Sequence, residues 1–137
     1  MSLTRNAILN SKDRAVKEVE VKEWGGVVYI REMSGRERFD LQDRMKQLMD
    51  DAAKGGETGE EAIGVAIISA GARGELLVRC LCDKDGELIF SEDDVDQIEM
   101  KNSNVVQRLF ELATSFNGMS TEDGDPESEE REAAKNF

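Results

Sequence analysis

Two cysteines and a run of acidic residues are the side chains of this chain with the clearest potential for chemistry. Cys80 and Cys82 could ligate a metal, but a structural zinc site needs four nitrogen or sulfur ligands. The sequence has no histidine and no further cysteine, so two thiols would close such a site only across a dimer. We therefore interpret at least one of them as a core cysteine, and the two are too few and too close together for a disulfide framework.

The segment that begins at Asp83 is similar to the start of a calcium-binding loop. An EF-hand loop places glycine at position 6 and a bidentate glutamate at position 12, whereas these positions hold Leu88 and Asp94 here. The glycine, Gly86, falls at position 4 instead, so we predict a plain turn. Unspecific calcium binding by the neighbouring carboxylates is the alternative. These carboxylates belong to Glu92, Asp93, Asp94 and Asp96.

Catalysis has little support in the sequence. Without histidine there is no imidazole base that titrates near neutral pH, and a cysteine nucleophile would lack its usual partner. The sequence contains neither of the two glycine-rich motifs that bind phosphate groups, G-x-x-x-x-G-K-[ST] and G-x-G-x-x-G. With 30 acidic residues, pairs of carboxylates are expected by chance. We predict a protein that is not an enzyme and needs no cofactor or metal.

The net charge of −12 is concentrated in two short segments. Residues 83–99 carry 8 acids and one base, and residues 122–137 carry 7 acids and two bases, whereas residues 1–82 are nearly balanced. Such acidity repels phosphate, so we expect no nucleic-acid or membrane partner. The acidity either keeps the protein soluble or attracts a basic partner.

No run of about 18 apolar residues and no signal-peptide pattern is present, so we expect a cytoplasmic protein.

Residues 16–31 carry the clearest strand signal. Val19 and Val21 alternate with charged residues, as in a strand with one buried face. Gly25 and Gly26 accept the positive φ angles of a tight hairpin turn, and the β-branched and aromatic residues 27–30 supply the return strand. An isolated hairpin is marginal in water, so it should pack on helices. Its open edge makes self-association a further expectation.

Helices are expected at about 34–52, 61–81, 92–99 and 103–117, after a short one capped by Thr4. Ser34 and Glu37 have the spacing of a capping box, and apolar residues recur on one face of the segment that follows. These are Leu41, Met45, Leu48, Met49 and Ala52. In the segment 61–81, one buried face would be formed by Ile63, Ile67, Ala70, Leu77 and Leu81.

Three glycines interrupt the second of these helices. Each of Gly64, Gly71 and Gly74 is about 1 kcal/mol less favourable than alanine inside a helix. The helix could break near Gly71, or the glycines could permit close packing, and the sequence leaves both alternatives open.

The elements together predict an α+β fold, mostly helical, with four or five helices and one N-terminal hairpin. Residues 1–119 would form a single globular domain in which the hairpin packs on helices 34–52 and 103–117. Residues 120–137 are acidic and have no apolar stripe, so we expect a mobile tail.

Three aromatic residues and two methionines are the candidates for partner binding. Trp24 and Tyr29 are of the types that dominate binding hot spots, and Phe39 borders the stripe of the helix 34–52. For these aromatics the alternative is packing beneath the hairpin as core. Met45 and Met49 could supply adaptable contacts, or could fill the core.

Several segments, taken in order, resemble the tail assembly chaperones of long-tailed bacteriophages (siphophages), the group of the lambda G protein. The resemblance covers about two thirds of the chain. Residues 51–74 show no such resemblance. The segments are Leu3–Leu9, Val19–Arg31, Met33–Arg38, Cys82–Val95 and Leu109–Gly118.

This resemblance implies a function without catalysis. Such proteins bind the long tape measure protein and keep it soluble in the host cytoplasm while the tail tube protein polymerises, and they are absent from the mature virion. Many also exist in a longer, frameshifted form whose added segment contacts the tail tube protein. An acidic inhibitor that mimics DNA is the alternative function, motivated by the net charge.

Overall fold

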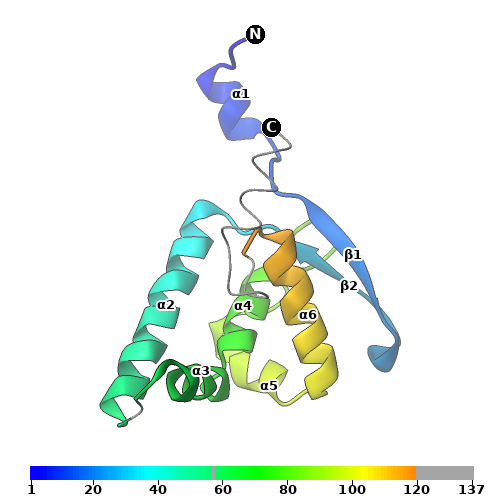
Figure 1. The fold of residues 1–137 in the computed structure, drawn as a ribbon. Helices are drawn as coiled ribbons and strands as arrows, with labels where there is room; N and C mark the ends of the chain where they lie inside the picture. The colour runs from blue at the N-terminus through cyan, green and yellow to red at the C-terminus, as the bar shows by residue number, and fades with distance from the viewer. Residues whose placement is uncertain (57, 120–137) are drawn as a thin grey trace, which may run out of the picture.

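The computed structural model describes residues 1–56 and 58–119 and shows the expected α+β architecture (Figure 1). The expected acidic tail, 120–137, lies outside the described residues. Six α-helices occur in the described part, more than expected, because the second long segment is divided. They are α1 (Arg5–Asn10), α2 (Gly35–Lys54), α3 (Glu60–Ser69), α4 (Ala72–Cys80), α5 (Val95–Glu99) and α6 (Ser103–Phe116).

The hairpin extends into a three-stranded antiparallel sheet in the described part of the chain, with the order β1-β2-β3. The strands are β1 (Val16–Val21), β2 (Gly26–Arg31) and β3 (Leu81–Cys82). The expected two-glycine turn is wrong. Val21 pairs with Gly26, and the connection is a 3-10 turn, η1 (Lys22–Trp24), closed by Gly25 at φ +76°. The Gly25 amide donates to the Lys22 carbonyl at 3.0 Å, so only the first glycine needs the left-handed conformation.

The two open alternatives for the glycines of 61–81 both occur, at different positions. The chain breaks at Gly71, which adopts φ +101° between α3 and α4. Gly74 instead permits close packing, because a Cβ there would lie 2.9 Å from Cγ1 of Val95. The break leaves Ala70 exposed rather than on the expected buried face.

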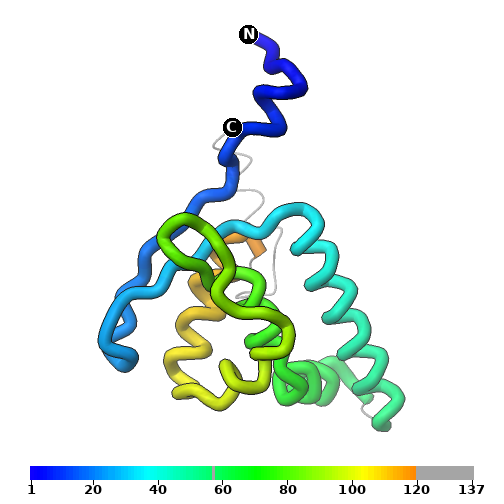
Figure 2. Tube along the Cα trace, turned by 180° about the vertical axis from the view of Figure 1, so that it is seen from behind, coloured from blue at the N-terminus to red at the C-terminus, as the bar shows by residue number. Residues whose placement is uncertain are grey.

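Helix α4 is the centre of the core and lies between α2, α5 and α6 (Figure 1). The buried side chains of the hairpin belong to the same cluster as Leu41 of α2 and Leu109 of α6. Strand β2 packs on α6, as expected, whereas α2 packs mainly on α3 and α4. Behind the helices, the chain from β3 to α5 crosses the molecule as a loop (Figure 2). It includes a second short turn, η2 (Glu92–Asp94), so the expected helix at 92–99 is η2 followed by α5.

Capping residues fix where the helices begin. The Ser34 hydroxyl accepts from the Glu37 amide at 3.1 Å and the Glu37 carboxylate accepts from the Ser34 amide at 2.8 Å, which is the predicted capping box. Glu37 also pairs with the buried guanidinium of Arg31 at the end of β2. The start of α2 is therefore tied to the sheet.

Asn117, directly after α6, joins three elements. Its side-chain oxygen accepts from the Met33 amide at 2.7 Å, and its amide group donates to the Arg31 carbonyl at 3.3 Å and the Ala113 carbonyl at 2.9 Å. These bonds connect the end of α6 to the segment between β2 and α2. They also satisfy backbone groups that would otherwise be partly buried without a partner.

Helix α1 projects away from the other elements (Figures 1 and 2). It is capped as predicted, since the Thr4 hydroxyl accepts from the Ala7 amide at 3.1 Å. None of its residues is buried, and Leu3, Ile8 and Leu9 are exposed around it. Because α1 is short and lacks packing, it receives the least stabilisation of all the helices described.

Candidate functional site

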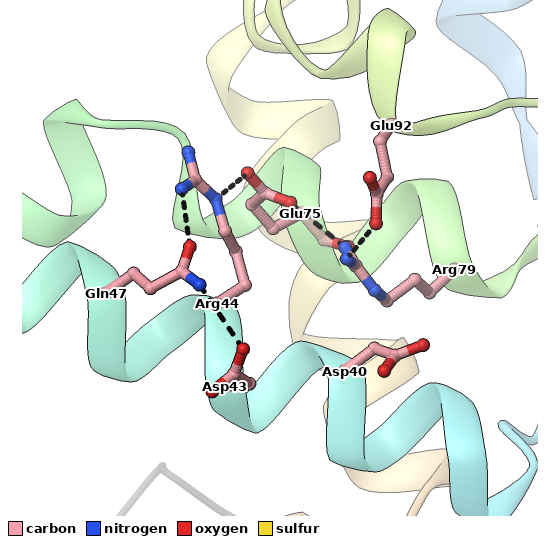
Figure 3. Close-up of a pocket in the computed structure, with 7 residues that line it drawn as sticks. All are labelled: Asp40, Asp43, Arg44, Gln47, Glu75, Arg79 and Glu92. Carbon is pink, nitrogen blue, oxygen red and sulfur yellow. Dashed lines mark hydrogen bonds and ion pairs between the residues drawn. The ribbon is translucent and has the colours of Figure 1, made fainter.

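A polar pocket of about 380 Å³ lies between α2, α4 and η2 (Figure 3). Charged residues predominate in its lining. They are Asp40, Asp43, Arg44, Gln47, Glu75, Arg79 and Glu92. Four carboxylates face two guanidinium groups, so the pocket carries an excess of negative charge.

The centre of this pocket is a buried carboxylate held between two arginines. Glu75 and Arg79 are only 5% and 7% exposed. The Glu75 carboxylate accepts from Nε of Arg44 at 2.8 Å and from Arg79 at 3.0 Å, and Arg79 also donates to Glu92 at 2.7 Å. Burial of an unpaired charge is costly, and the contact between Glu75 and Arg79 gives each of these two buried charges a partner. The hydrogen bond that Arg44 donates to Glu75 raises the pKa of Arg44.

This network connects segments that are far apart in the sequence. Arg44 comes from the middle of α2, Glu75 and Arg79 from successive turns of α4, and Glu92 from η2 (Figure 3). The sequence interpretation missed it. The i,i+4 spacing of Glu75 and Arg79 was the one local signal for it, because the partners from α2 and η2 have no sequence signature.

The geometry of the described residues offers no poised catalytic group. Cys80 is buried, and this burial raises the pKa of its thiol to about 12, which keeps it protonated and unreactive. Burial also raises the pKa of Cys82. Both cysteines therefore lie in the core, where at least one was predicted. In residues 1–56 and 58–119, no three metal-ligating side chains lie close enough to hold a metal ion.

The acidic segment after β3 forms the predicted turn. The Asp83 carboxylate accepts from the amides of Asp85 and Glu87 at 2.8 and 3.0 Å, and Gly86 adopts φ +88°. Ser91 and Asp94 then form a second capping box at the start of η2. These carboxylates are engaged with the backbone of their own loop, which is the arrangement of an Asx turn.

The predicted partner-binding residues fall into two groups. Phe39, Met45 and Met49 all lie on α2, whereas Trp24 lies at the tip of the hairpin and Tyr29 on β2. Trp24 is 39% exposed, Phe39 63% and Met49 50%. The alternative that Trp24 and Phe39 pack beneath the hairpin is therefore wrong.

Tyr29 and Met45 are partly buried. Tyr29 donates its hydroxyl to Glu18 across the strand pair at 3.1 Å, and this hydrogen bond raises the pKa of Tyr29. Met45 packs on the core cluster.

The tip of the hairpin is fastened to α6 by an exposed ion pair. Both terminal nitrogens of Arg108 donate to the Glu23 carboxylate, at 3.0 and 3.1 Å. The hydrogen bond from Arg108 is the largest cause that lowers the pKa of Glu23 to about 2. This bidentate contact holds η1, and with it Trp24, against the side of the domain.

Comparison with known proteins gives the class to which this chain belongs. The profile of the phage tail assembly chaperone family matches residues 3–136, nearly the whole sequence. The chain is a member of the phage tail assembly chaperone family, as its sequence motifs indicated.

A solved structure of a tail assembly chaperone has a similar fold. The tail assembly chaperone of bacteriophage HK97 superposes with a TM-score of 0.57 and 24% sequence identity, over 81% of this chain and 94% of that one. At this identity the likeness concerns the fold. No curated protein sequence matches. Among the described residues, every helix is too short or too polar to cross a membrane.

Proposed function

We propose that this protein binds the tape measure protein and keeps it soluble while the tail tube is assembled around it. The observation that carries the proposal is the family match across residues 3–136. It acts in the cytoplasm of the bacterial host, by presenting a folded surface rather than by catalysis, and is not part of the mature virion. Contact with the tail tube protein would come from a longer, frameshifted form.

The structure offers physical support for a binding role. Three apolar side chains are exposed on rigid elements: Trp24 on η1, and Phe39 and Met49 on α2. Four ionisable groups of the pocket are paired with one another, as structural charges are, and the cysteine thiols are buried. The four belong to Arg44, Glu75, Arg79 and Glu92. A mostly negative surface keeps a complex with a long apolar client in solution.

Self-association belongs to the same proposal. Strand β1 lies at the edge of the described sheet, where its outer backbone groups can pair with another strand. Several copies could then line up along one extended client. The rival function, mimicry of DNA, has no support from the family to which the chain belongs.

Co-expression tests the proposal. The tape measure protein of the same phage would be produced alone, with this protein, and with an unrelated acidic protein of similar size and charge as the control. We expect the client to move into the soluble fraction and to co-purify only with this protein. Unchanged solubility, or equal rescue by the acidic control, would contradict the proposal.

A further inference from the structure

Helix α2 carries a second stripe of side chains in addition to the one that packs into the core. The buried stripe contains Leu41 and Leu48, with Ala52 on the next turn. The second stripe is exposed along its whole length. Its members, the α2 outer stripe, are Phe39, Gln42, Lys46, Met49 and Ala53.

The spacing of the α2 outer stripe is that of a coiled-coil seam. Successive members are separated by three, four, three and four residues. This alternation is the heptad pattern that keeps one face of a helix directed at one partner helix. Phe39, Met49 and Ala53 supply its apolar positions. Single exposed apolar residues need no explanation, whereas a heptad row along one helix is the geometry of a helix-binding face.

The position of α2 leaves this face accessible. In both views the helix lies at the edge of the molecule, and its inner side faces α3 and α4 (Figures 1 and 2). The capping box and the pairing of Arg44 with Glu75 fix the helix from two sides. The α2 outer stripe is therefore displayed on a rigid support, which lowers the entropic cost of binding.

Charge along one flank of the stripe indicates the chemistry of the partner. Asp43 and Asp50 are seven residues apart and occupy equivalent heptad positions beside the seam. Neither takes part in an ion pair among the described residues. The acidic pocket opens on the same side of α2, since Asp43 also lines it. Flanking charges of a heptad seam select partners of opposite charge, so a basic flank fits this one.

We propose that the α2 outer stripe docks one amphipathic helix of a client protein. The client helix has apolar residues at heptad spacing and lysine or arginine on the flank that faces Asp43 and Asp50. Lys46, at the middle of the seam, fixes the register of the pair. This inference rests on the proposed chaperone function and names the part of the chaperone that holds the client.

A designed peptide tests the docking directly. The probe is a fluorescent peptide of about four heptads with leucine at the seam and lysine on both flanks, whose mutual repulsion keeps it from pairing with itself. A scrambled peptide of the same composition is the control for non-specific attraction to an acidic protein. Binding to the full-length protein is measured by anisotropy at physiological salt. We expect the patterned peptide to bind at least about tenfold more tightly than the scrambled one.

Two sets of variants locate the binding face. The double substitution Phe39→Ser and Met49→Ser should weaken binding by roughly tenfold or more. The matched control removes two exposed apolar residues elsewhere, Val27→Ser and Ile89→Ser, and should leave binding unchanged. All these side chains are exposed, so circular dichroism should show the same fold in each case.

A charge exchange tests the acidic flank. Asp43→Lys together with Asp50→Lys should reverse the preference of the protein from the lysine-flanked peptide to a glutamate-flanked one, because like charges beside the seam repel. An unchanged preference would overturn the assignment of a basic client flank.

Other outcomes would also overturn the inference. One is equal binding of the patterned and scrambled peptides. Another is that the Phe39 and Met49 substitutions dissociate an oligomer while no peptide binds, which would make this face a contact between copies of the chain.

Co-expression separates the docking proposal from the proposed chaperone function. If wild-type protein and the Phe39/Met49 variant rescue the client equally, the docking site is wrong and the chaperone function stands. If the wild-type protein rescues nothing, the function fails.

Discussion

Replacement of Gly74 by alanine is the sharpest test of how the helices pack. Alanine is about 1 kcal/mol better than glycine inside a helix, so helix propensity alone predicts a gain in stability. Gly74 is the third residue of α4, directly opposite α5. A Cβ at this position would lie 2.9 Å from Cγ1 and 3.0 Å from the carbonyl oxygen of Val95, and 3.1 Å from Oε2 of Glu99.

The contact with the Val95 carbonyl cannot be relieved by a side-chain rotation, because it is backbone. The helix α5 must therefore move away from α4, and overpacking of this kind costs about 1–3 kcal/mol. The movement also strains the hydrogen bond that the Gly74 amide donates to the Glu99 carboxylate at 2.6 Å. A bond to a charged group contributes roughly 1.5–3 kcal/mol. The steric and hydrogen-bond losses exceed the gain in helix propensity. We therefore expect Gly74→Ala to lower the free energy of unfolding by about 1–3 kcal/mol.

Gly64→Ala is the matched control, since it makes the same substitution in α3 where no atom lies within 4 Å of the added Cβ. It should stabilise the protein by up to about 1 kcal/mol. Urea unfolding followed by circular dichroism measures both variants, and thermal midpoints should move by roughly 2–8 °C for each kcal/mol. If Gly74→Ala is as stable as the wild type or more so, the close approach of α4 and α5 is refuted.

Three further predictions concern single contacts. Asn117→Ala should lower the free energy of unfolding by about 1–3 kcal/mol, measured in urea, because a backbone N–H before α2 loses its acceptor. The Arg108 hydrogen bond lowers the pKa of Glu23 from 4.5 to about 2, so the stabilisation from this pair is fully present above pH 4.5 and is lost as the pH falls towards 2. Glu23→Gln should remove that part of the acid sensitivity in unfolding curves recorded across this range. Since burial raises the pKa of Cys80 to about 12, native protein should resist maleimide at about pH 8 and react in urea; rapid labelling of Cys80 in native protein would contradict its burial.

The sequence predicted the elements whose signal is local. The capping box of Ser34 and Glu37, the alternation around Val19 and Val21, and the apolar stripe that contains Leu109 each have a pattern set by a single helix or strand. These patterns correspond to α2, β1 and α6. The turn of the hairpin was predicted with the wrong type, because a pair of glycines is compatible with several loop geometries and the register of the strands decides between them.

The elements that the sequence did not predict depend on contacts at long range. Strand β3 has two residues and exists because Leu81 and Cys82 meet β2, so no periodicity can reveal it. Eight of the nine residues of α4 are buried, including Glu75 and Arg79. Charged residues in a helix usually indicate a surface helix. Here Glu75 and Arg79 pair with each other, and Arg44 and Glu92 from other elements complete the network that offsets the burial of these charges.

The partner-binding residues stay a prediction, and for a similar reason the sequence could name only some members of the α2 outer stripe. Phe39 and Met49 were selected by residue type, and both are exposed on the same helix. The proposed row also contains Gln42, Lys46 and Ala53, which by type alone are ordinary surface residues. Which of two possible stripes on α2 faces the core depends on where the rest of the chain packs, and no local pattern settles it.

The buried ion pairs and the exposed stripe can be understood together. A buried ion pair adds little net stability, because the desolvation of the charges offsets their attraction. Its hydrogen bonds are directional, however, and an arginine on α2 reaches Glu75 only when that side of the helix faces α4. Apolar packing of Leu41 and Leu48 would tolerate some rotation of the helix about its axis, whereas the Arg44 contact does not. Holding α2 in one rotation directs the same five side chains outwards in every copy, and the binding of one long client by many copies, as we propose, would need that uniformity.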